Sequence, residues 1–215
     1  MVLFYGGWLS QFYPVSFKDA SGQAYNCCEQ YMMSNKAKHF GDEEARRKIM
    51  MASKPQVHKS IGRTVRNFNA DEWDKVCDEI VFHGNFLKFS QNKELRSKLL
   101  GTGEKLIAEA SPTDRIWGIG LAAADPLAHN VATWEGQNRL GKAIMRVREL
   151  LRDSEDGESF PVAGAEPGAA AAAPASAEAS GAAAGGSPRP RAAPRARGPA
   201  STKRVQGGWS PPARR

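Results

Sequence analysis

The sequence contains few cysteines, no long apolar run and no dense group of metal-ligating residues. Its three cysteines, Cys27, Cys28 and Cys77, do not make a disulfide framework, and the adjacent pair is poorly placed to bridge to itself. No CxxC and no Cys/His cluster occurs at ligand spacing, so we expect neither a structural zinc nor a cofactor. A signal-peptide pattern and a membrane-spanning run are also missing, which favours an intracellular protein, cytoplasmic or nuclear.

The composition changes near residue 153 of the 215-residue chain. From there Ala, Gly, Pro, Ser and Arg dominate, with an alanine run at 169–173 and almost no large apolar side chain before Trp209. Such a segment buries too little apolar surface to offset the entropy that folding would cost. We therefore predict a folded domain over residues 1–152 and a disordered tail over residues 153–215.

The net charge of +7 divides into +5 for residues 1–152 and +2 for residues 153–215. Within the tail, all acids lie at or before Glu178 and all eight bases lie at or after Arg189. The basic arm from Arg189 to Arg215 fits loose contact with the phosphates of a nucleic acid, or a nuclear address. A solvated extension with no dedicated partner is the alternative. No membrane partner is expected.

Hydrophobic periodicity and helix-capping signals predict a predominantly helical α+β domain with a few short strands. Strands are expected at residues 2–5, 15–18 and 106–110, and a loop rich in Asp, Pro and Trp at 111–137. Helices are expected at about 26–41, 43–52, 54–61, 69–90, 93–100 and 138–152.

The helix predicted over residues 26–41 carries an acid and an amine on one face. Glu29 and Lys36 are seven residues apart, which places them roughly 10 Å apart along the helix axis. A purely structural interpretation exists for each residue. Asn26 and Glu29 have the spacing of a capping box, and Lys36 lies where a cation stabilises the helix dipole.

Four clusters occur in order along the chain: Tyr25-Asn26-Cys27-Cys28-Glu29-Gln30-Tyr31 with Lys36-Ala37, Ile61-Gly62-Arg63, Asp114-Arg115-Ile116-Trp117-Gly118-Ile119-Gly120, and Trp134-Glu135-Gly136-Gln137-Asn138-Arg139-Leu140-Gly141. Together they resemble the NADAR family of YbiA-like proteins, over about residues 4–151. The resemblance implies an N-glycosidase, which hydrolyses the bond between a ribose anomeric carbon and a nitrogen. Two substrate types are associated with the family: ribosylamino-pyrimidine intermediates of riboflavin synthesis, and ADP-ribose attached to guanine.

The resemblance also implies roles for individual residues. Glu29, Lys36 and Asp114 match catalytic positions of the family. Gln11 departs from the asparagine usual after the serine, which puts one substrate contact there in doubt. The candidates for substrate binding are Ser10, Phe12, Arg63, Trp73, Trp117, Gly118, Trp134 and Asn138.

The chemistry of C–N cleavage fits these residue types. Positive charge builds on the ribose ring as the bond breaks, so carboxylates near C1 stabilise it and a carboxylic acid protonates the departing nitrogen. Glu29 and Asp114 share those roles in a direct hydrolysis. Alternatively, Lys36 attacks C1 and passes through a Schiff base while Glu29 moves protons. We favour the covalent route, although the sequence does not decide.

Three of the binding candidates also have ordinary structural interpretations. Trp73 lies on an apolar helical stripe and is either a core residue or a stacking plate for a base. Arg63 either clamps a phosphate or is a surface arginine at a helix end. Gly118 either permits close approach of the backbone to a ligand or simply forms a turn.

We expect an enzyme that acts on ADP-ribosylated guanine. The loop 121–134, which resembles that of the longer-looped family members, and the basic arm favour this substrate over riboflavin intermediates. The alternatives are a module that binds ADP-ribose or NAD without turning it over, and a nucleic-acid-binding protein that works through its tail.

Overall fold

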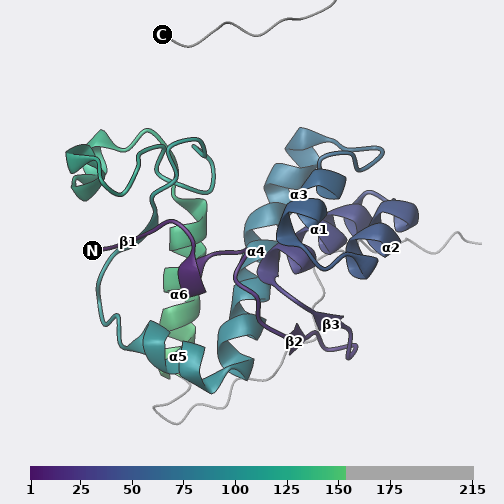
Figure 1. Ribbon diagram of the computed structural model, residues 1–215, viewed down its shortest axis with the longest axis horizontal. Coiled ribbons are helices and arrows are strands. Elements are labelled where there is room, and N and C mark those ends of the chain that lie inside the picture. Colours follow the sequence, from purple (N-terminus) through teal and green to yellow (C-terminus); the bar gives the residue numbers. More distant parts are fainter. Residues whose placement is uncertain (154–215) are drawn as a thin grey trace, which may run out of the picture. The chain divides into compact units, whose positions relative to one another are not determined.

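A computed structural model describes residues 1–153 (Figure 1). This part of the chain forms six α-helices and four short strands. The predicted fold class, a predominantly helical α+β domain, is confirmed. The predicted tail lies outside the described residues except for Asp153. Within residues 1–153, no helix is both long enough and apolar enough to cross a bilayer.

The first three helices are α1 (Cys28–His39), α2 (Glu43–Met51) and α3 (Pro55–Gly62), and α1 contacts both of the others. Their starts follow capping chemistry: Asp42 accepts a hydrogen bond from the N–H of Ala45, and α3 opens on a proline, whose missing N–H costs nothing there. The N-cap of α1 is Cys27, whose sulfur accepts from the N–H of Gln30, and not the predicted Asn26. The capping-box interpretation is wrong, because the N–H of Asn26 donates to the side chain of Gln30 and not to Glu29.

The long helix α4 (Ala70–Gln91) lies between α1 and α6 (Arg139–Asp153) (Figure 1). Asn69, the first residue of the helix expected at 69–90, caps it by accepting from the N–H of Glu72. Gly84 lets it approach α1 closely, because a Cβ at this position would lie 2.8 Å from the ring of Tyr31. The short helix α5 (Lys93–Leu100) follows α4 directly.

The strands form two separate pairs. β1 (Val2–Phe4) lies parallel to β4 (Ile107–Glu109), with Phe4 opposite Glu109, and β4 contacts α6. β2 (Phe17–Lys18) pairs antiparallel with β3 (Ala24–Tyr25), a strand that the sequence analysis missed. Two residues are too few to show an alternating pattern.

The apolar side chains form two clusters. The larger one joins α1, α4 and α6 and includes Phe89, Ile80 and Ile144. The smaller one lies under the predicted loop 111–137, where Ile119 and Leu121 pack with alanines from β4 onward. This loop contains two short 3-10 turns, Pro126–His129 and Val131–Thr133. It is therefore a packed segment and not an open connection.

Candidate functional site

A cavity of about 780 Å³ lies where α1, α3, the start of α4, and the segments 5–12 and 109–117 meet. Its volume is within the range of roughly 300–1,000 Å³ that is usual for small-molecule sites. Three acids and three bases line it: Glu29, Glu109, Asp114, Lys36, Lys59 and Arg63. Eight of the eleven predicted site residues line this cavity, namely Ser10, Phe12, Glu29, Lys36, Arg63, Trp73, Asp114 and Trp117.

Glu29 is the most enclosed acid of the cavity, with 5% of its surface exposed. Burial disfavours its charged form and raises the pKa of its carboxyl to about 7; Lys59 opposes this shift and Glu109 adds to it. The backbone N–H of Glu29 donates to the carbonyl of Gln11 at 3.0 Å, which ties the start of α1 to the cavity wall. A carboxyl with this pKa both gives and takes protons near neutral pH.

Lys36 lies two turns further along α1 and is half-buried. Its Nζ is 4.0 Å from the ring centre of Phe68 and 5.6 Å from that of Trp73. Burial lowers the pKa of this amine, and the charge of Glu29 partly offsets the shift. A lowered pKa increases the fraction of neutral amine, which is the nucleophilic form.

The segment 10–12 forms one wall of the cavity and is held by α4. The buried Lys88 donates from Nζ to the carbonyl of Ser10 at 3.0 Å, and Asn85 donates to the side chain of Gln11 at 3.0 Å. The hydroxyl of Ser10 accepts from the N–H of Phe12 at 3.1 Å. Gln11, noted as a departure from the family pattern, is thus engaged both by α4 and by Glu29.

Two cations reach the cavity from one face of α3, since Lys59 and Arg63 are four residues apart. The Nζ of Lys59 lies 5.7 Å from the ring centre of Phe12. Arg63 is exposed, and its charge, like that of Lys59, lowers the pKa of Glu29. Cations placed in this way fit a negatively charged substrate.

Asp114 and Trp117 form a tight turn at the edge of the cavity. Oδ1 of Asp114 accepts from the N–H groups of Ile116 at 3.0 Å and Trp117 at 2.8 Å. One carboxylate oxygen is therefore occupied in holding the turn. The ring of Trp117 lines the cavity, and the guanidinium of Arg139 lies 5.4 Å from its centre.

The other three predicted binding residues, Gly118, Trp134 and Asn138, lie outside the cavity lining. Trp134 packs on the smaller apolar cluster and donates from its indole N–H to the carbonyl of Ala128 at 2.9 Å. A Cβ on Gly118 would lie 2.9 Å from the carbonyl oxygens of Asp114 and Glu109, so this glycine allows close backbone packing.

Asn138 is 1% exposed and has φ of 51°. Its side chain donates to the carbonyl of Ile107 at 3.0 Å and accepts from the N–H of Glu109 at 3.1 Å. A side chain on Gly141 would collide with this amide, since a Cβ there would lie 2.4 Å from Oδ1 of Asn138. The Asn138–Gly141 motif therefore fixes β4, and through it the position of Glu109.

Sequence reasoning missed Glu109, Lys59 and an apolar group at the cavity mouth. Tyr5, Phe68 and Ile116 line the cavity yet are 69%, 46% and 50% exposed. The only sequence signal for Glu109 is one charged residue in the otherwise small and apolar run 106–110. The sequence does contain a signal for Lys59, because this residue lies one helical turn before Arg63, which was a predicted binding residue.

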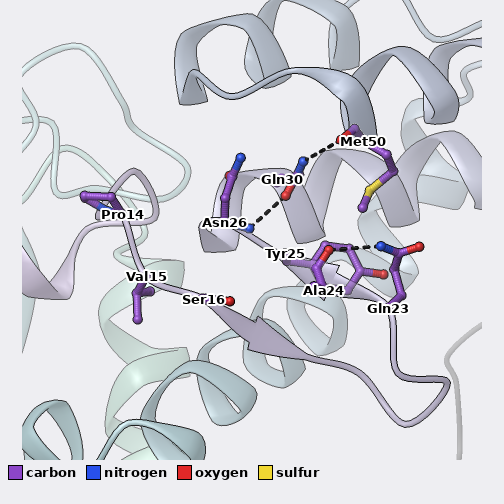
Figure 2. A pocket seen from close by; sticks show the side chains of 9 residues that line it. All are labelled: Pro14, Val15, Ser16, Gln23, Ala24, Tyr25, Asn26, Gln30 and Met50. Atoms are coloured by element: carbon purple, nitrogen blue, oxygen red, sulfur yellow. Dashed lines mark hydrogen bonds between the residues drawn. The ribbon is translucent and has the colours of Figure 1, made fainter.

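A second and more open hollow lies beside the first residues of α1 (Figure 2). Figure 2 shows that Gln30 joins Asn26 to Met50 there: Gln30 accepts from the N–H of Asn26 at 2.8 Å and donates to the carbonyl of Met50 at 3.3 Å. Its lining side chains include no carboxylate, amine, guanidinium or imidazole. These contacts hold α2 against α1, and the phenol of Tyr25 is the one ionisable side chain in the lining of this hollow.

Comparisons with known proteins identify the family. The model of the NADAR domain matches residues 4–152, so the chain belongs to this family. N-glycosidase R617 of Acanthamoeba polyphaga mimivirus is 50% identical over 144 residues, which cover 65% of this chain and 85% of the relative. Protein irg-1 of Caenorhabditis elegans is 34% identical over 165 residues, covering 70% and 78% of the two chains.

The E. coli protein YbiA supports the fold as well as the family. N-glycosidase YbiA of strain K12 is 31% identical over 130 residues, covering 60% of this chain and 72% of the relative. The NMR structure of E. coli YbiA superimposes with a TM-score of 0.60 at 28% identity, covering 74% of this chain and 89% of that chain. The protein is thus a NADAR-domain protein with a YbiA-like fold, and several of its relatives are named N-glycosidases.

Proposed function

We propose that this protein is an N-glycosidase that hydrolyses a ribose C1–N bond and releases ADP-ribose from ADP-ribosylated guanine. The observation that carries this proposal is the pair on α1. Glu29 has a pKa raised to about 7, and the pKa of Lys36 is lowered by burial in the same cavity. A pure binding module would not need a carboxyl of raised pKa and an amine of lowered pKa in one ligand cavity. The relatives named N-glycosidases support the reaction class.

In the proposed reaction, the neutral amine of Lys36 attacks C1 and the C1–N bond to the base breaks. The carboxylic acid of Glu29 gives its proton to the departing nitrogen. The ribose ring opens as a proton passes from the amine to the ring oxygen, which leaves a protonated Schiff base between C1 and Lys36. Water then adds to C1, the C1–Lys36 bond breaks, and the sugar leaves as its aldehyde form.

The cavity also supports an ADP-ribosylated base as substrate. Lys59 and Arg63 supply cations for a pyrophosphate. The exposed side chains of Tyr5, Phe68 and Ile116 at the mouth offer an apolar surface for the planar leaving base. The loop 121–134 contributes no residue to the cavity lining, so it does not support the preference drawn from the sequence.

The decisive experiment incubates the full-length protein with ADP-ribosylated guanine in DNA and measures free ADP-ribose. Riboflavin intermediates and a Lys36→Ala variant run in parallel. Release of ADP-ribose by the wild type alone supports the proposal. Tight ADP-ribose binding without release would instead identify a binding module, and release from the pyrimidine substrates only would move the activity to the riboflavin intermediates.

Borohydride trapping separates the covalent route from direct hydrolysis. Reduction during turnover should leave a sugar adduct on Lys36 of the wild type, detectable by peptide mass spectrometry, and none on Lys36→Ala. An actively releasing wild type that yields no adduct, or a Lys36→Ala variant that yields the same amount, would exclude the covalent role.

A further inference from the structure

Glu109 lines the cavity, and one oxygen of its carboxylate is buried without a hydrogen-bond partner. Among the described residues, its Oε2 is one of four buried side-chain polar atoms without a hydrogen-bond partner. Leaving such an atom unpaired is costly, because it has lost its water and gained no protein donor. The feature is easier to understand at a site that a substrate or a reacting water molecule enters.

The backbone of Glu109 is held more firmly than its side chain. Its N–H donates to Asn138, and its carbonyl accepts from the N–H groups of Ser111 at 3.0 Å and Ile119 at 2.9 Å. It also lies opposite Phe4 in the strand pair. The backbone from which the carboxyl projects is therefore held in place. A residue that must contact a substrate in one geometry requires this kind of support.

The charged groups that line the cavity with Glu109 come from three elements: Glu29 and Lys36 on α1, Lys59 and Arg63 at the end of α3, and Asp114 in the following turn. Burial raises the pKa of Glu109 to about 7, Asp114 adds to the shift and Lys59 opposes it. Glu109 in turn raises the pKa of Glu29. Both carboxyls therefore exchange protons near neutral pH.

We propose that Glu109 is a further catalytic residue, whose carboxylate takes a proton from the water molecule that attacks C1 and frees the sugar from Lys36. This role rests on the proposed N-glycosidase activity. Glu29, on the same helix as Lys36, protonates the departing base in the first step. Asp114 is less suited to the water, because one of its oxygens already accepts two backbone N–H groups.

The proton balance of the cycle links the two glutamates. Glu29 loses one proton to the base. Water adds to the Schiff base, its oxygen bonds to C1 and its proton passes to Glu109. The carbinolamine then moves its hydroxyl proton to the nitrogen as the C1–Nζ bond breaks, which regenerates the neutral amine. The cycle ends with one proton more on Glu109 and one fewer on Glu29, and proton exchange with solvent resets both carboxyls.

The test compares base release and sugar release in wild type, Glu109→Gln and the matched control Glu104→Gln, whose side chain is 82% exposed and lies outside the cavity lining. Loss of a general base slows its step by about 10²- to 10⁴-fold. We expect sugar release to slow by at least about tenfold in Glu109→Gln. Base release should slow less, and the adduct on Lys36 trapped by borohydride should increase.

The second arm asks whether an external carboxylate can replace the side chain. Formate should restore sugar release in Glu109→Ala and leave Lys36→Ala inactive. The Glu109→Ala variant also keeps the proposal testable if Glu109→Gln does not fold. Equal losses in both steps, a loss below about tenfold, or no rescue by formate would overturn the role of Glu109. A wild type that releases no ADP-ribose would instead refute the proposed function itself.

Discussion

Replacing Glu29 by Gln should stabilise the fold, and the gain should grow with pH. Glu29 is 5% exposed, and burial raises the pKa of its carboxyl from 4.5 to about 7. A carboxyl whose folded pKa is raised contributes its full stability below the unfolded pKa of 4.5. That contribution is lost as the pH rises through the folded value. Glutamine has nearly the same shape and does not ionise, so the variant carries no such cost at any pH.

The magnitude follows from the size of the pKa difference. Each unit corresponds to about 1.4 kcal/mol, so the full cost of ionising Glu29 in the folded state is about 3 kcal/mol. The part that develops between pH 5 and pH 8 is about 2 to 3 kcal/mol. The side chain is almost fully enclosed, so solvent screening does not reduce this figure appreciably.

Urea denaturation of wild type, Glu29→Gln and Glu104→Gln at pH 5, 6, 7 and 8 measures the effect. The free energy of unfolding of Glu29→Gln should exceed that of the wild type by an amount that rises with pH, whereas Glu104→Gln should show no such trend. Turnover by Glu29→Gln should fall by about 10²- to 10⁴-fold despite the greater stability. A stability difference that is the same at every pH would refute the argument.

Three further predictions concern residues around the site. Asn138→Ala should lower the free energy of unfolding by about 2 to 5 kcal/mol, measured by urea denaturation, because two buried backbone groups lose their partner. Trp134→Phe should leave KM within about twofold and lower the stability by about 1 to 3 kcal/mol, because the bond from the indole to Ala128 and part of the ring's packing on the smaller apolar cluster are lost. Glutamine in place of the eight bases from Arg189 to Arg215 should raise KM for an ADP-ribosylated oligonucleotide and leave turnover of a modified mononucleotide unchanged, which would support contact between this arm and nucleic acid.

The sequence predicts the helices well where their ends carry local signals. Asp42 and Asn69 each mark the start of an expected helix, because each caps an N–H within the next turn, and Pro55 opens α3 at its first position without a side-chain cap. Cys27 was missed as the cap of α1, since a thiol is not among the preferred capping groups. The pairing of β1 with β4 joins segments about a hundred residues apart, which no local pattern specifies.

The site was predictable only where a helix or a recognisable motif connects its members. Glu29 and Lys36 share one helix, so their spacing alone is enough to place them in the same region of the cavity. Glu109 enters from a three-residue strand, and its raised pKa depends on groups from other elements. Asn138 was assigned to the substrate from the family resemblance, and only the fold shows that both ends of its amide bind the backbone of β4.

Two buried polar side chains of α4, Lys88 and Asn85, hold the segment beside Glu29. Lys88 is fully buried, which lowers the pKa of its amine and carries a desolvation cost that an apolar residue would not have. Its ammonium holds the carbonyl of Ser10, and the next carbonyl, of Gln11, holds the N–H of Glu29. Burial of Lys88 therefore costs stability, but the buried ammonium fixes the position of the cavity wall and, through it, of Glu29. A leucine or methionine at position 88 would avoid the desolvation cost, but it would leave the carbonyl of Ser10 without this donor and the segment 10–12 held to α4 by Asn85 alone.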